Sequence, residues 1–212
     1  MIRPLSAVRH TASLLLLLIP IASALAAERV IKEYSFTTDN IDHIDLQGAV
    51  GTLTVVHTDK PEVNVVLEIR QQDDGWFDDD VNLENVELDS EVHGSRLALE
   101  QTTEEVIIDW TVELPTVART SIDFGVGEID GQFGETELRA NLGVGEVDVT
   151  LPLAAVGAVD LSVGVGEATL RGAGHDVERR AFISQDVSGE GNGDKDLDIE
   201  VGVGEIRVGL ED

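Results

Sequence analysis

Four glutamates each follow a Gly-Val-Gly tripeptide, and their type and spacing make them the first candidates for chemistry. They are Glu128, Glu146, Glu167 and Glu205. If the segments that carry them stack as neighbouring strands, the first three carboxylates should lie on one face about 4.8 Å apart, with Glu205 further along. Like charges opposite one another destabilise a sheet, so this ladder needs solvent screening, raised pKa values or a bound cation.

Calcium is the cation that best suits a carboxylate ladder, because it takes about six to eight oxygen ligands. The better-known calcium motifs do not fit. An EF-hand loop that begins at Asp194 has Ile199 where a glycine is required. The residues therefore leave two interpretations: a ladder that binds Ca²⁺, or a solvated polar face with offset side chains.

A second candidate lies in an acidic stretch, where Trp76 and Phe77 stand between Asp73 and Asp80. An exposed aromatic pair flanked by acids is typical of a contact surface. The stretch fits a partner-binding tip, a calcium loop, or a plain loop whose aromatic side chains cover one end of the fold.

The residue types needed for catalysis are scattered or absent. The histidines after the N-terminal segment, His43, His57, His93 and His175, show no close metal-ligand spacing, and the chain has no cysteine. No Gly-x-Ser-x-Gly nucleophile motif occurs. We therefore expect no enzyme, no catalytic residues and no bound organic cofactor.

The elements that would position the glutamates belong to an internal repeat. The first glycines of the four motifs are Gly125, Gly143, Gly164 and Gly202, which are 18, 21 and 38 residues apart. A degenerate copy at 189–191 would fill the long gap, and 48–51 resembles an earlier copy. A period of about 19 residues is typical of stacked units that bury their apolar faces against their neighbours.

Each motif is followed by strict alternation of polar and apolar residues, which predicts a half-buried strand. The period fits one rung of a β-solenoid or parallel β-helix, the interpretation we favour, or a pair of strands in an antiparallel sandwich of repeated hairpins. The glycines would be structural, because they permit tight corners and close backbone approach. They are Gly125, Gly127, Gly143, Gly145, Gly164, Gly166, Gly202 and Gly204.

The N-terminal segment 1–26 is predicted to be a signal peptide, with a basic head, an apolar run and Ala24-Leu25-Ala26 before the cleavage point. Residues 27–212 would then form one all-β domain with an acidic insertion at 71–92. No later segment is apolar enough to cross a membrane. Shorter strands are expected at 43–46, 52–56 and 63–69, with a turn around Pro61.

The charge balance excludes some partners. The chain has 14 Lys and Arg against 42 Asp and Glu, for a formal charge of −28. Loss of 1–26 removes two arginines and brings the charge to −30. Such a charge repels nucleic acid and anionic lipid, and attracts divalent cations and basic surfaces.

The segments 44–55, 161–167 and 201–208 resemble a bacterial family of putative adhesins. The resemblance covers most of the chain after 27, and it rests on glycine-spaced strands. It implies a repetitive β-helical domain at the cell envelope. The family has no catalytic residues that could be transferred to this chain.

The sequence therefore predicts an exported, non-catalytic, adhesin-like module in the periplasm or at the cell surface. Its partner would be a protein or another cell-surface component that meets an acidic, repetitive face. Two alternatives stay open: a structural or sensory accessory of an envelope-stress system, and a binding protein stabilised by calcium.

Overall fold

The structure is a computed structural model that describes residues 29–72, 81–103, 105–172, 177–180 and 185–212. The predicted signal peptide, Trp76, Phe77 and His175 lie outside these ranges. Within them the chain is all-β, apart from one short 3₁₀ helix. No helix in the described part of the chain has the length and apolarity needed to cross a bilayer.

The strands join one 12-stranded sheet of parallel and antiparallel pairs. The N-terminal elements are β1 Arg29–Thr37, β2 His43–Thr58, β3 Glu62–Gln71, η1 Leu83–Asn85, β4 Asp89–His93, β5 Arg96–Gln101 and β6 Val106–Pro115. The later elements are β7 Arg119–Gln132, β8 Glu137–Pro152, β9 Val156–Arg171, β10 Val177–Arg180, β11 Gln185–Glu190 and β12 Lys195–Glu211.

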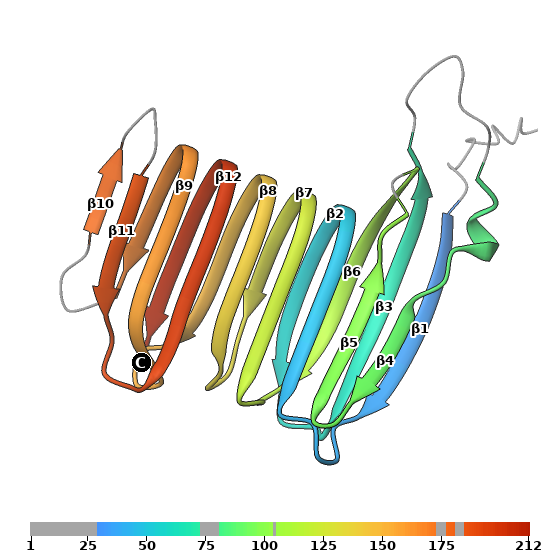
Figure 1. The fold of residues 1–212 in the computed structure, drawn as a ribbon, viewed down its shortest axis with the longest axis horizontal. Helices are drawn as coiled ribbons and strands as arrows, with labels where there is room; N and C mark the ends of the chain where they lie inside the picture. The colour runs from blue at the N-terminus through green and yellow to red at the C-terminus, as the bar shows by residue number, and fades with distance from the viewer. Residues whose placement is uncertain (1–28, 73–80, 104, 173–176, 181–184) are drawn as a thin grey trace, which may run out of the picture.

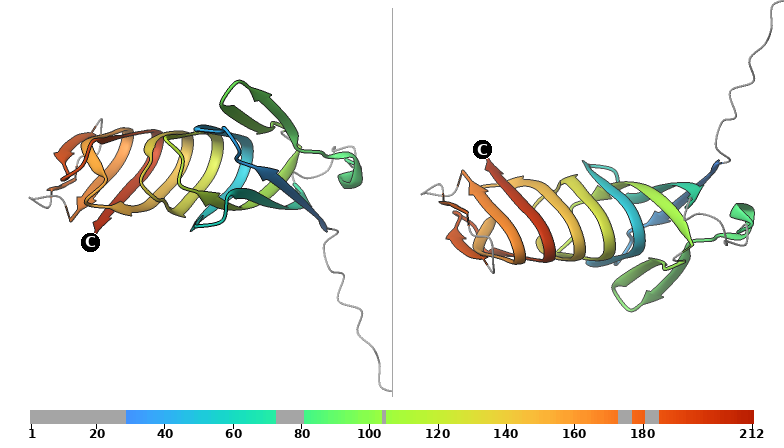
Figure 2. Two further views of the ribbon diagram at one scale, coloured as in Figure 1. Left: turned by 90° about the horizontal axis from the view of Figure 1, so that it is seen from below. Right: turned by 90° about the horizontal axis from the view of Figure 1, so that it is seen from above.

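Five long strands form the body of the molecule: β2, β7, β8, β12 and β9 lie side by side in that order, all parallel. Each bends in its middle, so that its first arm lies in one layer and its second arm in the other (Figures 1 and 2). The first arms continue through β5 to β4 at one end and to β11 at the other. The second arms continue through β6 and β3 to β1, and at the far end to β10.

The Gly-Val-Gly tripeptide makes the bend. In β7, Gly127 has a φ of 145°, in the left-handed region that side chains rarely adopt. A Cβ on Gly127 would also run into the carbonyl oxygen of Gly51 on the neighbouring β2. The bend reverses the alternation: Phe124 and Ile129 are both buried although an odd number of positions separates them. One continuous strand can therefore face the same core from both layers.

The core lies between the two layers and consists mainly of aliphatic side chains. In β8, Leu138, Ala140 and Leu142 face it from the first arm, and Val147 and Val149 face it from the second. The aromatic pair Trp110 and Phe124 packs edge to face with ring centroids 5.9 Å apart. Because every bent strand contributes from both sides, the core runs the length of the stack.

The N-terminal end of the core is covered by the segment 81–88, which contains η1. Leu83, Val86 and Leu88 are buried there. Lys32 of β1 donates hydrogen bonds to the carbonyl oxygen of Glu84 and to the carboxylate of Glu87. Part of the predicted acidic insertion thus closes one end of the sheet.

The repeat differs from a simple sequential stack in two places. β12 lies between β8 and β9, although these two are consecutive in the chain. The expected degenerate copy at 189–191 is no bend, because β11 runs antiparallel to the first arm of β9. The early copy at 48–51 is a bend and pairs directly with β7, and the strands expected at 43–46 and 52–56 are its two arms. The turn around Pro61 lies where it was predicted, between β2 and β3.

Candidate binding surface

The glutamates of the four motifs form a column across neighbouring second arms, which we call the carboxylate column. Glu128 is in register with Glu146, Glu146 with Glu205, and Glu205 with Glu167. Glu205 therefore lies inside the column, between Glu146 and Glu167. This order differs from the expected one, in which Glu205 lay further along, because β12 inserts between β8 and β9.

The next outward position of each second arm forms a second column, with Asp130 on β7, Asp148 on β8 and Arg207 on β12 in register. Arg207 brings positive charge to this surface. Its guanidinium donates to both carboxylate oxygens of Glu146, at 3.2 and 3.3 Å, and to Glu205 at 2.5 Å. The hydrogen bond to Glu146 is the main cause that raises the pKa of Arg207. One guanidinium thus bridges glutamates on two adjacent strands.

At the β7 end of the column the repulsion is not relieved. Repulsion from the Asp130 carboxylate, followed by partial burial, raises the pKa of Glu128 above its usual value. A hydrogen bond with Asp130 and the charges of Glu146 and Asp148 act in the same direction. The charged groups that contribute most to this shift are all carboxylates, although Arg70, which is paired with Asp109, lines the same shallow groove as Glu128. A cation supplied from outside would relieve the repulsion between Glu128 and Asp130.

The valines of the four motifs form an exposed ridge beside the carboxylate column. Val126, Val144, Val203 and Val165 are in register, and between 46% and 49% of each is exposed. We call this the valine ridge. The bends that carry these valines lie along the upper edge of the stack in Figure 1. Near β2 it borders a shallow groove of about 410 Å³, whose lining includes Val50, Ile107 and Glu128.

The outer face of the first arms has a different charge pattern, in which two arginines pair with acids on the neighbouring strand. Arg119 of β7 donates to Glu137 of β8 at 2.8 Å, and this bond lowers the pKa of Glu137. Arg139 of β8 lies 3.3 Å from Asp198 of β12. These two ion pairs run across the strands, although Asp160 of β9 lies in register beside Asp198 on the same face.

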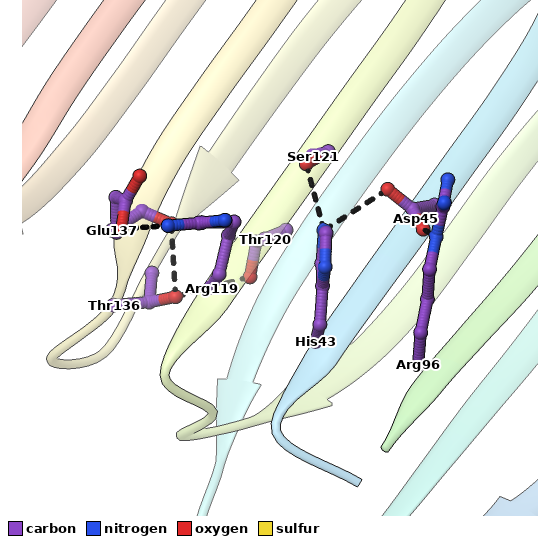
Figure 3. Close-up of polar contacts among 8 residues, drawn as sticks. All are labelled: His43, Asp45, Arg96, Arg119, Thr120, Ser121, Thr136 and Glu137. Carbon is purple, nitrogen blue, oxygen red and sulfur yellow. Dashed lines mark hydrogen bonds and ion pairs between the residues drawn. The ribbon is translucent and has the colours of Figure 1, made fainter. Parts of the chain in front are cut away.

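A further polar cluster lies where β5 joins the first arms of β2 and β7 (Figure 3). His43 Nε2 lies 3.0 Å from Ser121 Oγ and 3.1 Å from Asp45 Oδ1, and Asp45, 4% exposed, also accepts from Arg96. A serine–histidine–aspartate relay needs the serine and the acid on opposite ring nitrogens. Here both contact Nε2, so the arrangement ties three strands together and does not activate Ser121.

Several predicted site residues fall outside this picture. Trp76 and Phe77 lie beyond the described residues, so their role in partner contact stays a prediction. Among the described residues, no group of three or more His, Asp or Glu side chains has the arrangement of a metal site. Calcium binding by Glu128, Glu146, Glu167 and Glu205 stays a prediction as well.

Two features of the surface were not identified from the sequence. Val126 and its equivalents have the residue type of a core position, because valine is usually buried in strands. The odd spacing between buried positions on the two sides of each motif, as between Phe124 and Ile129, was the signal that the middle residue points outward. No signal connected Arg207 with Glu146, which is 61 residues away.

Comparison with known proteins places the fold. No protein-family model matches the chain, and neither does any curated protein. A solved structure described as a putative cell adhesion protein from Clostridium sporogenes is similar over 87% of this chain and 100% of its own, with 16% identity and a TM-score of 0.52. A putative adhesin from Bacteroides fragilis is similar over 86% of this chain and 98% of its own, with 11% identity and a TM-score of 0.32.

The likeness to the Clostridium structure agrees with the resemblance to bacterial putative adhesins noted from the sequence. At 16% identity, the Clostridium protein shows a shared fold. The class defined by fold and surface is therefore an all-β protein with the fold of a putative bacterial adhesion protein. The second arms of its bent strands carry the carboxylate column and the valine ridge.

Proposed function

We propose that this protein is a non-catalytic, exported, adhesin-like binding module of the bacterial cell envelope. Its bent strands act as the rungs of a solenoid-like stack. The stack presents the second-arm face to a basic partner, a protein or another component of the cell surface.

The observation that carries this proposal is the register of the carboxylate column. Four strands present glutamate at the same position, and in-register pairing holds each side chain beside the next. Like charges so placed cost stability, and a solvent-facing position could accept a neutral residue instead. A binding role accounts for the retained repulsion, because a basic partner relieves it on contact.

The test is retention of the labelled protein on bacterial envelope fragments at low and at high salt. We expect retention at low salt that falls steeply as salt rises, because exposed charges are screened. The double variant Glu128→Gln/Asp130→Asn should lose most of it. The matched control Glu33→Gln/Glu62→Gln changes the charge equally at exposed positions of β1 and β3. The proposal would be refuted if retention did not change with salt concentration and was the same for the Glu128/Asp130 variant as for the unaltered protein.

Calcium stabilisation is the second candidate, and the unrelieved repulsion between Glu128 and Asp130 favours it. A cation that binds between these carboxylates only in the folded protein would stabilise that state, by an amount that grows with the logarithm of the free cation concentration above the dissociation constant. Calcium at millimolar concentration should then raise the melting temperature more than magnesium does at equal ionic strength. An equal rise with both ions, or none with either, would exclude this candidate.

A further inference from the structure

The valine ridge is the exposed apolar feature that the carboxylate column does not explain. The middle residue of each bend points away from the core, so a polar residue would serve there equally well. Instead Val126, Val144, Val203 and Val165 leave almost half of each side chain in solvent. A continuous apolar stripe rimmed by charge is typical of a surface that meets a partner.

We propose that the valine ridge and the carboxylate column together dock a basic amphipathic helix of a partner protein. This inference rests on the proposed function and specifies the surface and the partner. The helix would lie along the stack, across the bends, with an apolar stripe on the ridge. Its lysines or arginines would face the column.

Charge complementarity indicates that the residues beside the apolar stripe of the partner helix are basic. Within each motif the exposed valine and the column glutamate are separated by one glycine, so apolar and acidic stripes run side by side. Arg207 shows how the column accepts a cation, because its guanidinium bridges Glu146 and Glu205. Glu128 and Asp130 offer neighbouring carboxylates on β7, in register with Glu146 and Asp148 of β8.

The spacing of the ridge favours a helix over an extended segment. Adjacent strands lie about 4.8 Å apart, and an α-helix advances about 5.4 Å per turn, so successive turns stay close to successive valines. In an extended strand, side chains on one face repeat every ~6.8 Å, which does not match the spacing of the valines. The four valines span about 14 Å, the length of about ten helical residues.

The experiment measures binding of a synthetic peptide by fluorescence anisotropy. The probe is a hydrocarbon-stapled helix with leucines along one stripe and lysines on the flanking positions. A stapled peptide of the same composition, with the stripe scrambled, is its control. The protein should bind the first peptide more tightly than the second, with an affinity that weakens as salt rises.

The decisive variant is Val126→Thr/Val144→Thr/Val203→Thr, because threonine keeps the shape and the strand preference of valine. We expect its dissociation constant for the striped peptide to rise roughly tenfold, because less apolar surface is buried against the leucines of the peptide. Val92→Thr is the control: Val92 is 60% exposed on β4, away from the ridge. If the triple variant does not fold, Val144→Thr alone takes its place, with a smaller expected loss.

The outcomes separate this inference from the proposed function. If the threonine variant binds the striped peptide as the unaltered protein does, or the scrambled peptide binds equally well, the helix-docking inference is wrong. Salt-dependent retention on envelope fragments would still support the proposed function in that case. Binding of neutral phosphatidylcholine vesicles, without binding of the striped peptide, would instead assign the ridge to a lipid surface and overturn the inference.

Discussion

The two outer faces of the stack are made by the same five strands, yet their cations are placed differently. On the first arms, two arginines pair with acids on the neighbouring strand, Arg119 with Glu137 and Arg139 with Asp198. On the second arms, Glu128 and Asp130 of β7 are in register with Glu146 and Asp148 of β8, and Arg207 of β12 contacts the acids of β8. The ion pairs of the first arms stabilise strand pairing. The acids of the second arms produce a negative potential that attracts an external cation.

The bend that separates the two faces gives the largest expected effect. Gly145→Ala would place a methyl group against the carbonyl oxygen of Gly127, at a φ of 144°. We expect the free energy of unfolding to fall by about 3 kcal/mol or more, because strain and a backbone clash act together. Urea unfolding followed by circular dichroism measures the loss.

The matched control is Gly209→Ala on β12. The nearest atom to a Cβ at Gly209 is a side-chain oxygen of Thr150 at 3.5 Å, which is an ordinary van der Waals distance. This variant should retain the stability of the unaltered protein within about 1 kcal/mol. Equal stability of the Gly145 and Gly209 variants would show that the bend does not depend on the conformation of glycine.

The buried positions within each strand could mostly be predicted from the sequence, because the alternation of polar and apolar residues after each motif is a local pattern. Ile129 and Val147 are buried as that alternation requires. The order of the strands could not be predicted, since β7, β8, β9 and β12 carry nearly the same motif and any of them could pair with any other. The position of β12 between β8 and β9 depends on long-range packing, which no local pattern records.

The same limit applies to the surface. The glutamates could be assigned to one face, because the alternation gives their direction. Their order and their relief by Arg207 depend on which strands are neighbours, so neither could be predicted. The exposed valines were missed because the bend reverses the alternation, and that reversal depends on the positive φ of glycines such as Gly127.

Removal of the Arg207 charge from the second-arm face gives an intermediate effect. Arg207→Gln leaves the facing Glu146 and Glu205 without their shared guanidinium. We expect the free energy of unfolding to fall by about 1 kcal/mol at low salt, because the side chain is partly exposed and its pairs are partly screened. The loss should shrink as salt is added, which a series of thermal melts at rising salt concentration measures.

Arg139→Gln is the comparison on the first-arm face, where the cation lies within ion-pair distance of Asp198. Its effect should be smaller, roughly 0.5 kcal/mol, since Arg139 is more exposed than Arg207 and makes one ion pair at 3.3 Å, whereas Arg207 bridges two glutamates. If the two arginine variants lose the same stability with the same salt dependence, the two faces do not differ electrostatically.

The smallest expected effect is on the melting temperature, which glutamine substitutions at two glutamates should shift in opposite directions. The pKa of Glu128 is raised in the folded protein, so its ionised form destabilises the fold, and this penalty grows as the pH rises through the raised pKa. The pKa of Glu137 is lowered by its bond to Arg119, so its ionised form stabilises the fold, and this contribution is lost as the pH falls through the lowered pKa.

Glu128→Gln should therefore raise the melting temperature at neutral pH, and Glu137→Gln should lower it. Both differences should fade as the pH falls and the carboxylates become protonated. Shifts of the same sign at neutral pH would mean that the column is no more strained than the paired face, and the proposed attraction for a basic partner would lose its electrostatic basis.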